Sequence, residues 1–229
     1  MLHDLKFYMK SVLIFFGIYL RKSWRPRKQS NDSQVPVSLS DLVIASERSY
    51  FGETAKSEAH RQSEGFFQNY CQGKGLDIGC NGDPIVLGVH VWEYAKHGDA
   101  TLLNGLPDDF FDFVYSSHLL EHLENPAVAI KNQFRVLKHG GYLILVVPHR
   151  DLYEKRKRLP SRWAPEHQHF FMPFENERPC TIGVKALVQS ALENFEIIYI
   201  KVRDVGHTVR NQRIHSEGEY SIECVVKKV

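Results

Sequence analysis

Residues 74–82 read Lys-Gly-Leu-Asp-Ile-Gly-Cys-Asn-Gly, and this stretch decides the fold that we expect. The apolar residues on either side of Asp77 predict a short buried strand, and Gly79 predicts the tight turn that ends it. An acidic side chain and a turn of backbone N–H groups therefore lie together. In open α/β sheets, ligands bind at the carboxyl ends of the strands. The stretch thus favours a nucleotide-type cofactor site at one edge of a sheet.

Further elements with the same α/β character follow this stretch. Residues 111–115 predict a strand that breaks into the polar run Ser116-Ser117-His118, and residues 142–147 predict a third strand, which Pro148 ends. Between them, Asn125-Pro126 is typical of a helix start, and Gly140 is expected to close that helix. The last elements expected are a helix over 184–194 and strands over 195–202 and 220–226.

The order of these segments resembles the class I S-adenosylmethionine-dependent methyltransferases, in the group that modifies small molecules and glycans. The motifs that carry the resemblance are Asp-x-Gly-Cys at 77–80, Phe-Asp-x-Val at 111–114 and Leu-Lys-x-Gly-Gly at 137–141. The resemblance covers roughly residues 72–229. It implies an α/β, Rossmann-like sheet of seven strands, mostly parallel, with an antiparallel hairpin made by the two C-terminal strands.

The resemblance also implies S-adenosyl-L-methionine as cofactor. In such a site, Asp77 would pair with the cationic end of the methionine part, Glu93 would bind the ribose, and Asp99 would accept from the adenine amine. A surface glutamate and a turn aspartate are the alternatives for the last two. The full set of implied cofactor contacts is Asp77, Gly79, Cys80, Asn81, Glu93, Asp99, Ala100 and Ser116.

Two features depart from that family's pattern. Asn81 and Asp83 stand where the turn usually has glycines, although asparagine tolerates the left-handed conformation. The stretch between Asp77 and Asp99 is also too short for the usual helix, strand and helix. One crossover must therefore be cut short, with residues 85–92 as the only candidate for the second strand.

Three histidines are candidate catalytic bases, because imidazole titrates near neutral pH. His118 and His122 are spaced to share one face of a helix, and His149 directly follows the third predicted strand. All three would lie at the sheet edge where an acceptor meets the cofactor. Catalysis by proximity alone remains the alternative.

The same region has the composition of a metal site. His118-x-x-Glu121-His122 with a distant His-x-His resembles the metal-binding arrangement of RNA-terminal 2′-O-methyltransferases, with His118 in place of a glutamate. Imidazole and carboxylate ligands suit a divalent transition ion. A metal-free pocket is the preferred interpretation, and metal binding and plain packing are the alternatives. The candidate ligands are Glu121, His122, His167 and His169.

Composition sets the class of protein. The chain has 229 residues, 43% of them hydrophobic and 24% charged, which is ordinary for one globular domain. A formal net charge of +2 argues against broad nucleic-acid binding. The four cysteines show no paired C-x-x-C spacing, which favours a reducing, cytoplasmic location.

The N-terminus differs from the rest. Residues 12–20 are an apolar run too short to cross a bilayer comfortably, and residues 21–28 are strongly basic. We expect either a peripheral anchor at the inner membrane face, with contact through residues 7–28, or a helix packed on the domain. The expected boundaries are 1–28 for this segment, 29–40 for a linker and 41–229 for the methyltransferase domain.

The residues and the resemblance together predict a methyltransferase that acts on an oxygen of a small molecule or a cell-surface glycan or glycolipid, as in polysaccharide biosynthesis. The dense aromatic and imidazole residues of 163–171 fit such an acceptor. Two alternatives stay open: a catalytically silent binding module of the same fold, and a metal-dependent RNA-end 2′-O-methyltransferase.

Overall fold

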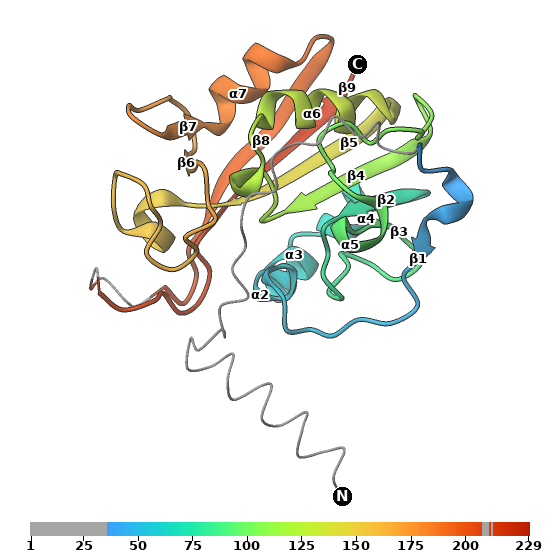
Figure 1. Ribbon diagram of the computed structural model, residues 1–229. Helices are drawn as coiled ribbons and strands as arrows, with labels where there is room; N and C mark the ends of the chain where they lie inside the picture. Colours follow the sequence, from blue (N-terminus) through green and yellow to red (C-terminus); the bar gives the residue numbers. More distant parts are fainter. Residues whose placement is uncertain (1–35, 208–210, 212) are drawn as a thin grey trace, which may run out of the picture. The chain divides into compact units, whose positions relative to one another are not determined.

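The computed structural model describes residues 36–207, 211 and 213–229, and its centre is a sheet of seven strands in the order β1-β3-β2-β4-β5-β9-β8 (Figure 1). The strands are β1 (Val43–Ile44), β2 (Gly75–Ile78), β3 (His90–Trp92), β4 (Phe111–Ser117), β5 (Leu137–Pro148), β8 (Phe195–Arg203) and β9 (Ser221–Lys228). β3, β2, β4 and β5 pair in parallel, and β9 is antiparallel to both β5 and β8. The expected mostly parallel sheet with an antiparallel C-terminal hairpin is therefore confirmed.

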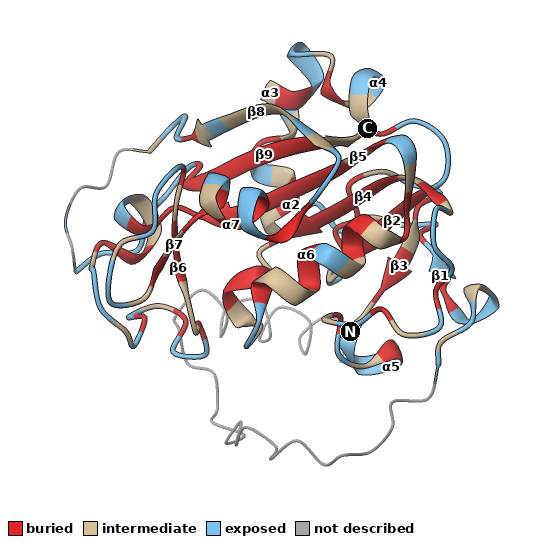
Figure 2. Cartoon of the chain, turned by 90° about the horizontal axis from the view of Figure 1, so that it is seen from above, coloured by how far each residue is buried: buried red, intermediate tan, exposed pale blue. Residues whose placement is uncertain are grey.

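Helices cover both faces of the sheet (Figure 2). The helices are α2 (Glu53–Lys56), α3 (Glu58–Ser63), α4 (Phe66–Tyr70), α5 (Tyr94–His97), α6 (Pro126–Arg135) and α7 (Val184–Ala191), with the short turns η1 (Leu39–Asp41), η2 (Leu120–His122) and η3 (Arg150–Glu154). Leu143 and Leu145 of β5 pack in the core that includes α6 and α7, whereas Ile144 and Val146 pack in the core that includes α4. This alternation follows from the pleat of the strand.

A second, two-stranded sheet lies outside the main one. It consists of β6 (Phe170–Met172) and β7 (Thr181–Gly183), which pair in parallel. An isolated bridge between His149 and Phe171 joins this small sheet to the end of β5. The loop that carries His167 and His169 is thereby held near the carboxyl edge of the main sheet.

The connection from β2 to β3 is the shortened crossover that the sequence predicted. Residues 79–89 contain no helix, because a helical crossover between parallel strands needs a dozen or more residues. The second strand forms only over the last part of the predicted range. The outer edge of β3 is covered by β1, a strand that precedes the glycine turn in the sequence. The two strands are antiparallel, with Val43 opposite Val91 and Ile44 opposite His90.

Helix α6 begins as predicted, because the side chain of Asn125 accepts a hydrogen bond from a backbone N–H of its first turn. The predicted end at Gly140 is wrong: α6 stops earlier, and Gly140 lies within β5. Lys228 Nζ donates to the carbonyl oxygens of Phe134 and Leu137, at 3.0 and 2.6 Å. A side chain from the last strand therefore satisfies the carbonyl groups at this helix end.

The expectations for residues 1–28 lie outside the described residues. Within the predicted linker, the N–H of Val37 already donates to the carbonyl oxygen of Asn104 at 2.9 Å. Among the described helices, none has the length and hydropathy needed to cross a membrane.

Candidate active site at the carboxyl edge of the sheet

The turn after β2 is a cradle of backbone groups held in left-handed conformations. Gly79, Asn81 and Gly82 have φ values of 78°, 48° and 83°. Asparagine therefore takes the place of a glycine, as the sequence predicted. The N–H of Gly79 donates to the carbonyl oxygen of Trp92 at 2.8 Å, which fixes the turn against the end of β3.

Glu93 closes this turn from the neighbouring strand. It directly follows β3, and its Oε1 accepts hydrogen bonds from the Asn81 N–H at 2.7 Å and the Cys80 thiol at 3.2 Å. Burial, together with the nearby Asp77 carboxyl, raises the pKa of the Cys80 thiol, so the thiol remains protonated. The contact places Glu93 at the glycine turn, where the resemblance would put a ribose-binding carboxylate.

Asp77 lies fully buried beneath the turn. Its Oδ2 accepts a hydrogen bond from the Ile85 N–H at 2.7 Å, whereas Oδ1 has no partner among the described residues. Burial raises the pKa of Asp77 to about 8, and the carboxyls of Glu93 and Asp83 act in the same direction. An unpaired buried carboxyl oxygen beside a glycine turn fits a cationic ligand group such as an ammonium.

The three remaining cofactor candidates have different surroundings. Asp99 is exposed, and its Oδ1 accepts from the Thr101 N–H at 2.7 Å, as in an ordinary turn. Ala100 is buried in the main core. Ser116 is buried next to Ile78 in the register of β4 and β2, and its hydroxyl has no partner among the described residues. Ser116 therefore offers a polar group beside the turn.

A pocket of about 240 Å³ lies beside the glycine turn. Its lining includes Cys80, Gly82 and Glu93 and the apolar side chains of Val43 and Val91. The residues around it thus offer an apolar surface next to a carboxylate, which suits a nucleoside. Together with Asp77 and the turn, they fit S-adenosylmethionine.

Helix α2 is fixed to the glycine turn by one carboxylate. Asp83 accepts from Arg48 Nε at 2.7 Å and from the Ala55 N–H at 3.0 Å. A side chain at Gly52 would lie only 2.6 Å from Asp83, so the close approach requires glycine there. The segment before β2 therefore lies over the carboxyl edge of the sheet.

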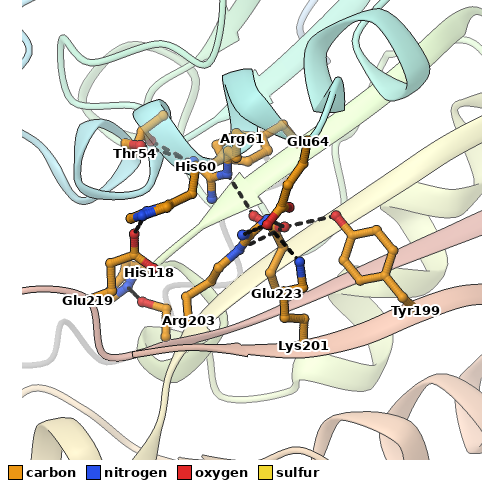
Figure 3. A network of polar contacts seen from close by, with 12 residues as sticks. Thr54, His60, Arg61, Glu64, His118, Tyr199, Lys201, Arg203, Glu219 and Glu223 are labelled. Atoms are coloured by element: carbon orange, nitrogen blue, oxygen red, sulfur yellow. Dashed lines mark hydrogen bonds and ion pairs between the residues drawn. The ribbon is translucent and has the colours of Figure 1, made fainter. Parts of the chain in front are cut away.

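A buried ion network fixes the next helix, α3, to the C-terminal hairpin (Figure 3). Arg61 donates to Glu223 at 2.7 Å, and Arg203 donates to the other oxygen of Glu223 at 2.6 Å. Arg203 also forms two 2.8 Å contacts with Glu64. Because Arg61 and Glu223 are fully buried, these contacts determine how α2 and α3 cover the site.

His118 lies at the end of β4, in a left-handed conformation with φ of 49°. Its Nε2 shares a hydrogen bond with Ser221 Oγ at 2.9 Å and lies 3.9 Å from Glu53, and its Nδ1 lies 3.5 Å from Glu121. Figure 3 shows His118 beside the ion network. Burial lowers the pKa of His118 to about 4, although Glu53 favours the charged form. A pKa in this range favours the neutral imidazole near pH 7, in which one ring nitrogen is unprotonated and can accept a proton.

The carboxyl of Glu121 lies among the imidazole rings of three histidines. Its Oε1 lies 3.5 Å from His118, 3.9 Å from His122 and 4.0 Å from His167. Burial raises the pKa of Glu121 to about 8 and lowers that of His122 to about 4. The structure thus brings together three of the four metal candidates with the candidate base His118.

His149 and His169 make different contacts. The Nδ1 of His149 accepts from the Asp151 N–H at 3.2 Å, where η3 begins. The Nε2 of His169 lies 3.1 Å from the carbonyl oxygen of Leu123. His149 is at the carboxyl edge as predicted, but its described contacts do not include His118 or His122.

Sequence reasoning did not find the residues that come from distant segments. Glu53 and Lys56 of α2 both contact the hydroxyl of Tyr220, and Glu53 does so at 2.6 Å. The Tyr220 ring packs edge-on against His118, with ring centroids 6.0 Å apart. No local motif marks these residues; only the folded chain brings α2 and the start of β9 together.

The sequence matches the family described as the methyltransferase domain over residues 44–178, which is more than half of the chain. This chain belongs to the methyltransferase family. The class I resemblance is therefore confirmed, and S-adenosyl-L-methionine is the cofactor of this methyltransferase. No curated protein is similar enough to the methyltransferase to count as a match.

Solved structures similar to the methyltransferase are S-adenosylmethionine-dependent methyltransferases of low sequence identity. The protein from Thermotoga maritima is 19% identical, with 75% of this chain and 97% of that chain covered and a TM-score of 0.42. The protein from Archaeoglobus fulgidus is 14% identical, with 78% and 96% covered and a TM-score of 0.45. The protein from Methanosarcina mazei is 19% identical, with 72% and 97% covered and a TM-score of 0.42.

Proposed function

We propose that this methyltransferase methylates a hydroxyl oxygen of a small molecule or of a cell-surface glycan or glycolipid. The observation that supports it most is the position of the His118 imidazole directly after β4, the strand next to the glycine turn. A hydroxyl acceptor loses its proton during methylation, and a neutral imidazole in place can take it.

Methyl transfer to a hydroxyl requires the protein to align the acceptor with the methyl group and to accept a proton. Bound S-adenosylmethionine supplies a methyl group on a sulfonium sulfur. Methyl transfer to the acceptor oxygen would break the carbon–sulfur bond of the cofactor and leave a neutral thioether. His118 accepts the hydroxyl proton, and Glu53, 3.9 Å away, stabilises the imidazolium. Alignment of the acceptor accounts for much of the remaining acceleration.

A group of aromatic rings that includes Tyr220, which packs against His118, supports a sugar-containing acceptor. The ring centroid of Tyr153 lies 4.9 Å from that of Tyr220 and 5.2 Å from that of His215. The ring centroids of Trp163 and His215 are 5.4 Å apart. The indole N–H of Trp163 has no partner among the described residues. Ring faces with polar edges suit the alternating apolar and hydroxyl surfaces of a sugar.

The basic residues that follow β5 argue against a phosphate-rich acceptor such as RNA. They are Arg150, Lys155, Arg156, Lys157 and Arg158. Arg150 is buried and pairs with Asp151 and Glu177, both at 2.7 Å. Lys155 is also buried and donates to the carbonyl oxygen of Ile214 at 2.9 Å. Lys157 Nζ also lies 4.0 Å from Glu177, so three of the five basic residues of this run have partners within the chain. With the low net charge, this favours the glycan or small-molecule acceptor.

A location at the cytoplasmic face of a membrane would suit a glycolipid acceptor. The apolar and basic residues within 7–28 support a peripheral contact of this kind. The acceptor class and the location are therefore proposed together, and each has its own test.

The acceptor proposal is tested with methyl-labelled cofactor and separate pools of glycans, glycolipids, small hydroxyl compounds and RNA. We expect label in a glycan, glycolipid or small-molecule product, attached through oxygen. Label in RNA alone, or attached to nitrogen or carbon, would overturn the proposal. With the labelled acceptor in hand, His118→Ala should lower kcat by about 10² while cofactor affinity stays unchanged. His139→Ala, an exposed histidine at the other edge of the sheet, is the matched control.

A further inference from the structure

Glu121 is a buried carboxyl whose oxygens have no hydrogen-bond partner in another described residue. Its side chain has no exposed surface, and both Oε1 and Oε2 are unpartnered. Such a group is costly to bury unless a proton or a cation accompanies it. His122 Nε2 and His167 Nε2 lie 3.9 and 4.0 Å from Oε1. A carboxyl and two imidazoles therefore converge on one small space.

We propose that Glu121, His122 and His167 bind a divalent transition-metal ion. One ligand atom from each residue lies within 4.8 Å of the other two. Bond lengths of about 2.0 to 2.2 Å place the ligand atoms of a tetrahedral ion about 3.3 to 3.6 Å apart, so the three side chains would move about 1 Å closer together on binding. Two nitrogens and one carboxylate oxygen suit zinc, cobalt(II) or manganese(II) better than magnesium or calcium. The ion would bind whatever the acceptor is, so this site goes beyond the proposed function.

The orientation of His167 gives independent support. Its Nδ1 lies 2.6 Å from Glu154 Oε1, and both side chains are buried. The Ser161 hydroxyl donates to the other oxygen of Glu154, which fixes that carboxylate in turn. A metal-binding histidine usually has its second ring nitrogen held by a carboxylate in this way. Glu154 is therefore a positioning residue that directs Nε2 of His167 toward Glu121.

The site is partly open to solvent and leaves a coordination position free. The side chain of His122 is 36% exposed, so this ligand faces solvent on one side. Three protein ligands leave at least one coordination position free, which is typical of catalytic rather than structural sites. His118 contacts the same carboxyl at 3.5 Å. The ion and the candidate base would thus share Glu121.

The metal-free alternative is a charged His167 that bridges Glu154 and Glu121. Titration of the chelator-treated full-length protein with Co²⁺, followed by visible absorption, separates the two. We expect saturation at one ion per chain, with an absorption band typical of cobalt bound by nitrogen and oxygen. Absence of saturable Co²⁺ binding, confirmed by calorimetry with Zn²⁺, would overturn the proposal.

Variants assign the ligands. Glu121→Gln, His122→Ala and His167→Ala should each weaken Co²⁺ binding at least tenfold, and Glu154→Gln should weaken it by about 10- to 100-fold. His169→Ala and His139→Ala are matched controls and should bind as the parent does. His122 is half-exposed, so its variant tests the site even if a buried variant does not fold. Unchanged affinity in a folded His122→Ala protein, or equal losses in the controls, would contradict the assignment.

Discussion

The backbone N–H of Asn81 donates to the carboxylate of Glu93 at 2.7 Å, so the residue after one strand closes the glycine turn of its parallel neighbour. The contact explains how the glycine turn keeps its conformation although no helix lies between β2 and β3. A single carboxylate both holds the turn and remains near the pocket beside it.

Glu93→Ala should lower the affinity for S-adenosylmethionine at least tenfold, which corresponds to about 1.4 kcal/mol. The variant loses the acceptor of the Asn81 N–H and the carboxylate proposed to bind ribose. Glu93→Gln keeps an acceptor oxygen and should have intermediate affinity. Calorimetry on each variant measures the change, and the exposed Glu193→Ala is the control. Parent-like affinity in Glu93→Ala would remove this residue from the cofactor site.

The buried carboxyl of Asp77 predicts a pH dependence of the cofactor-free protein. Its pKa is about 8 in the folded chain, against about 3.9 in an unfolded chain. The unfolded state therefore loses this proton first, and the contribution of Asp77 to stability falls as pH rises from about 4 to about 8. Above that range the contribution should be constant. The free energy of unfolding of the parent minus that of Asp77→Asn, measured in urea, should follow this curve. A flat or rising difference would show that Asp77 is ionised in the folded protein.

The buried pair between Arg61 and Glu223 predicts a large loss of stability on truncation. Arg61→Met should lower the free energy of unfolding by about 3 to 5 kcal/mol, because one partner of a fully buried ion pair is removed. Lys201→Met removes a partly exposed member of the same network and should cost less than about 1 kcal/mol. Urea unfolding measures both. Similar losses in the two variants would mean that burial does not determine the strength of these contacts.

Deletion of residues 1–28 should release the protein from anionic vesicles and leave the cooperative melt of the remaining chain unchanged. The intact protein should bind such vesicles less tightly as salt is added, because basic residues meet charged lipid headgroups. Vesicle sedimentation and a thermal melt test the two parts. A truncated protein that still sediments, or that no longer melts cooperatively, would favour a segment packed on the domain.

Local patterns were sufficient to predict much of the sheet. The strand around Asp77 and the start of α6 at Asn125 each follow from a few neighbouring residues, and both occur as expected. The end of α6 was predicted wrongly because Lys228, far along the chain, satisfies its last carbonyl groups. β1 has only two residues, and its pairing with β3 depends on the shortened crossover.

The candidate site was less accessible to sequence reasoning. The short spacing brings His118, Glu121 and His122 together. The prediction that His118 and His122 share one helix face is wrong, because His118 follows β4 in a left-handed conformation and η2 begins only at Leu120. Glu53 and Tyr220 come from opposite ends of the domain, so their contact with each other could not be read from local spacing. His149 was placed correctly at the sheet edge, but the start of η3 determines where its ring makes contacts.

Calorimetric titration of S-adenosylmethionine into the full-length protein tests the central claim most directly. The claim is that Asp77, Glu93 and the glycine turn form the cofactor site. We predict one cofactor molecule bound per chain, with affinity at least tenfold weaker in Asp77→Asn and in Glu93→Ala, and unchanged in Glu193→Ala. No binding by the folded parent protein, or parent-like affinity in both site variants, would contradict the account.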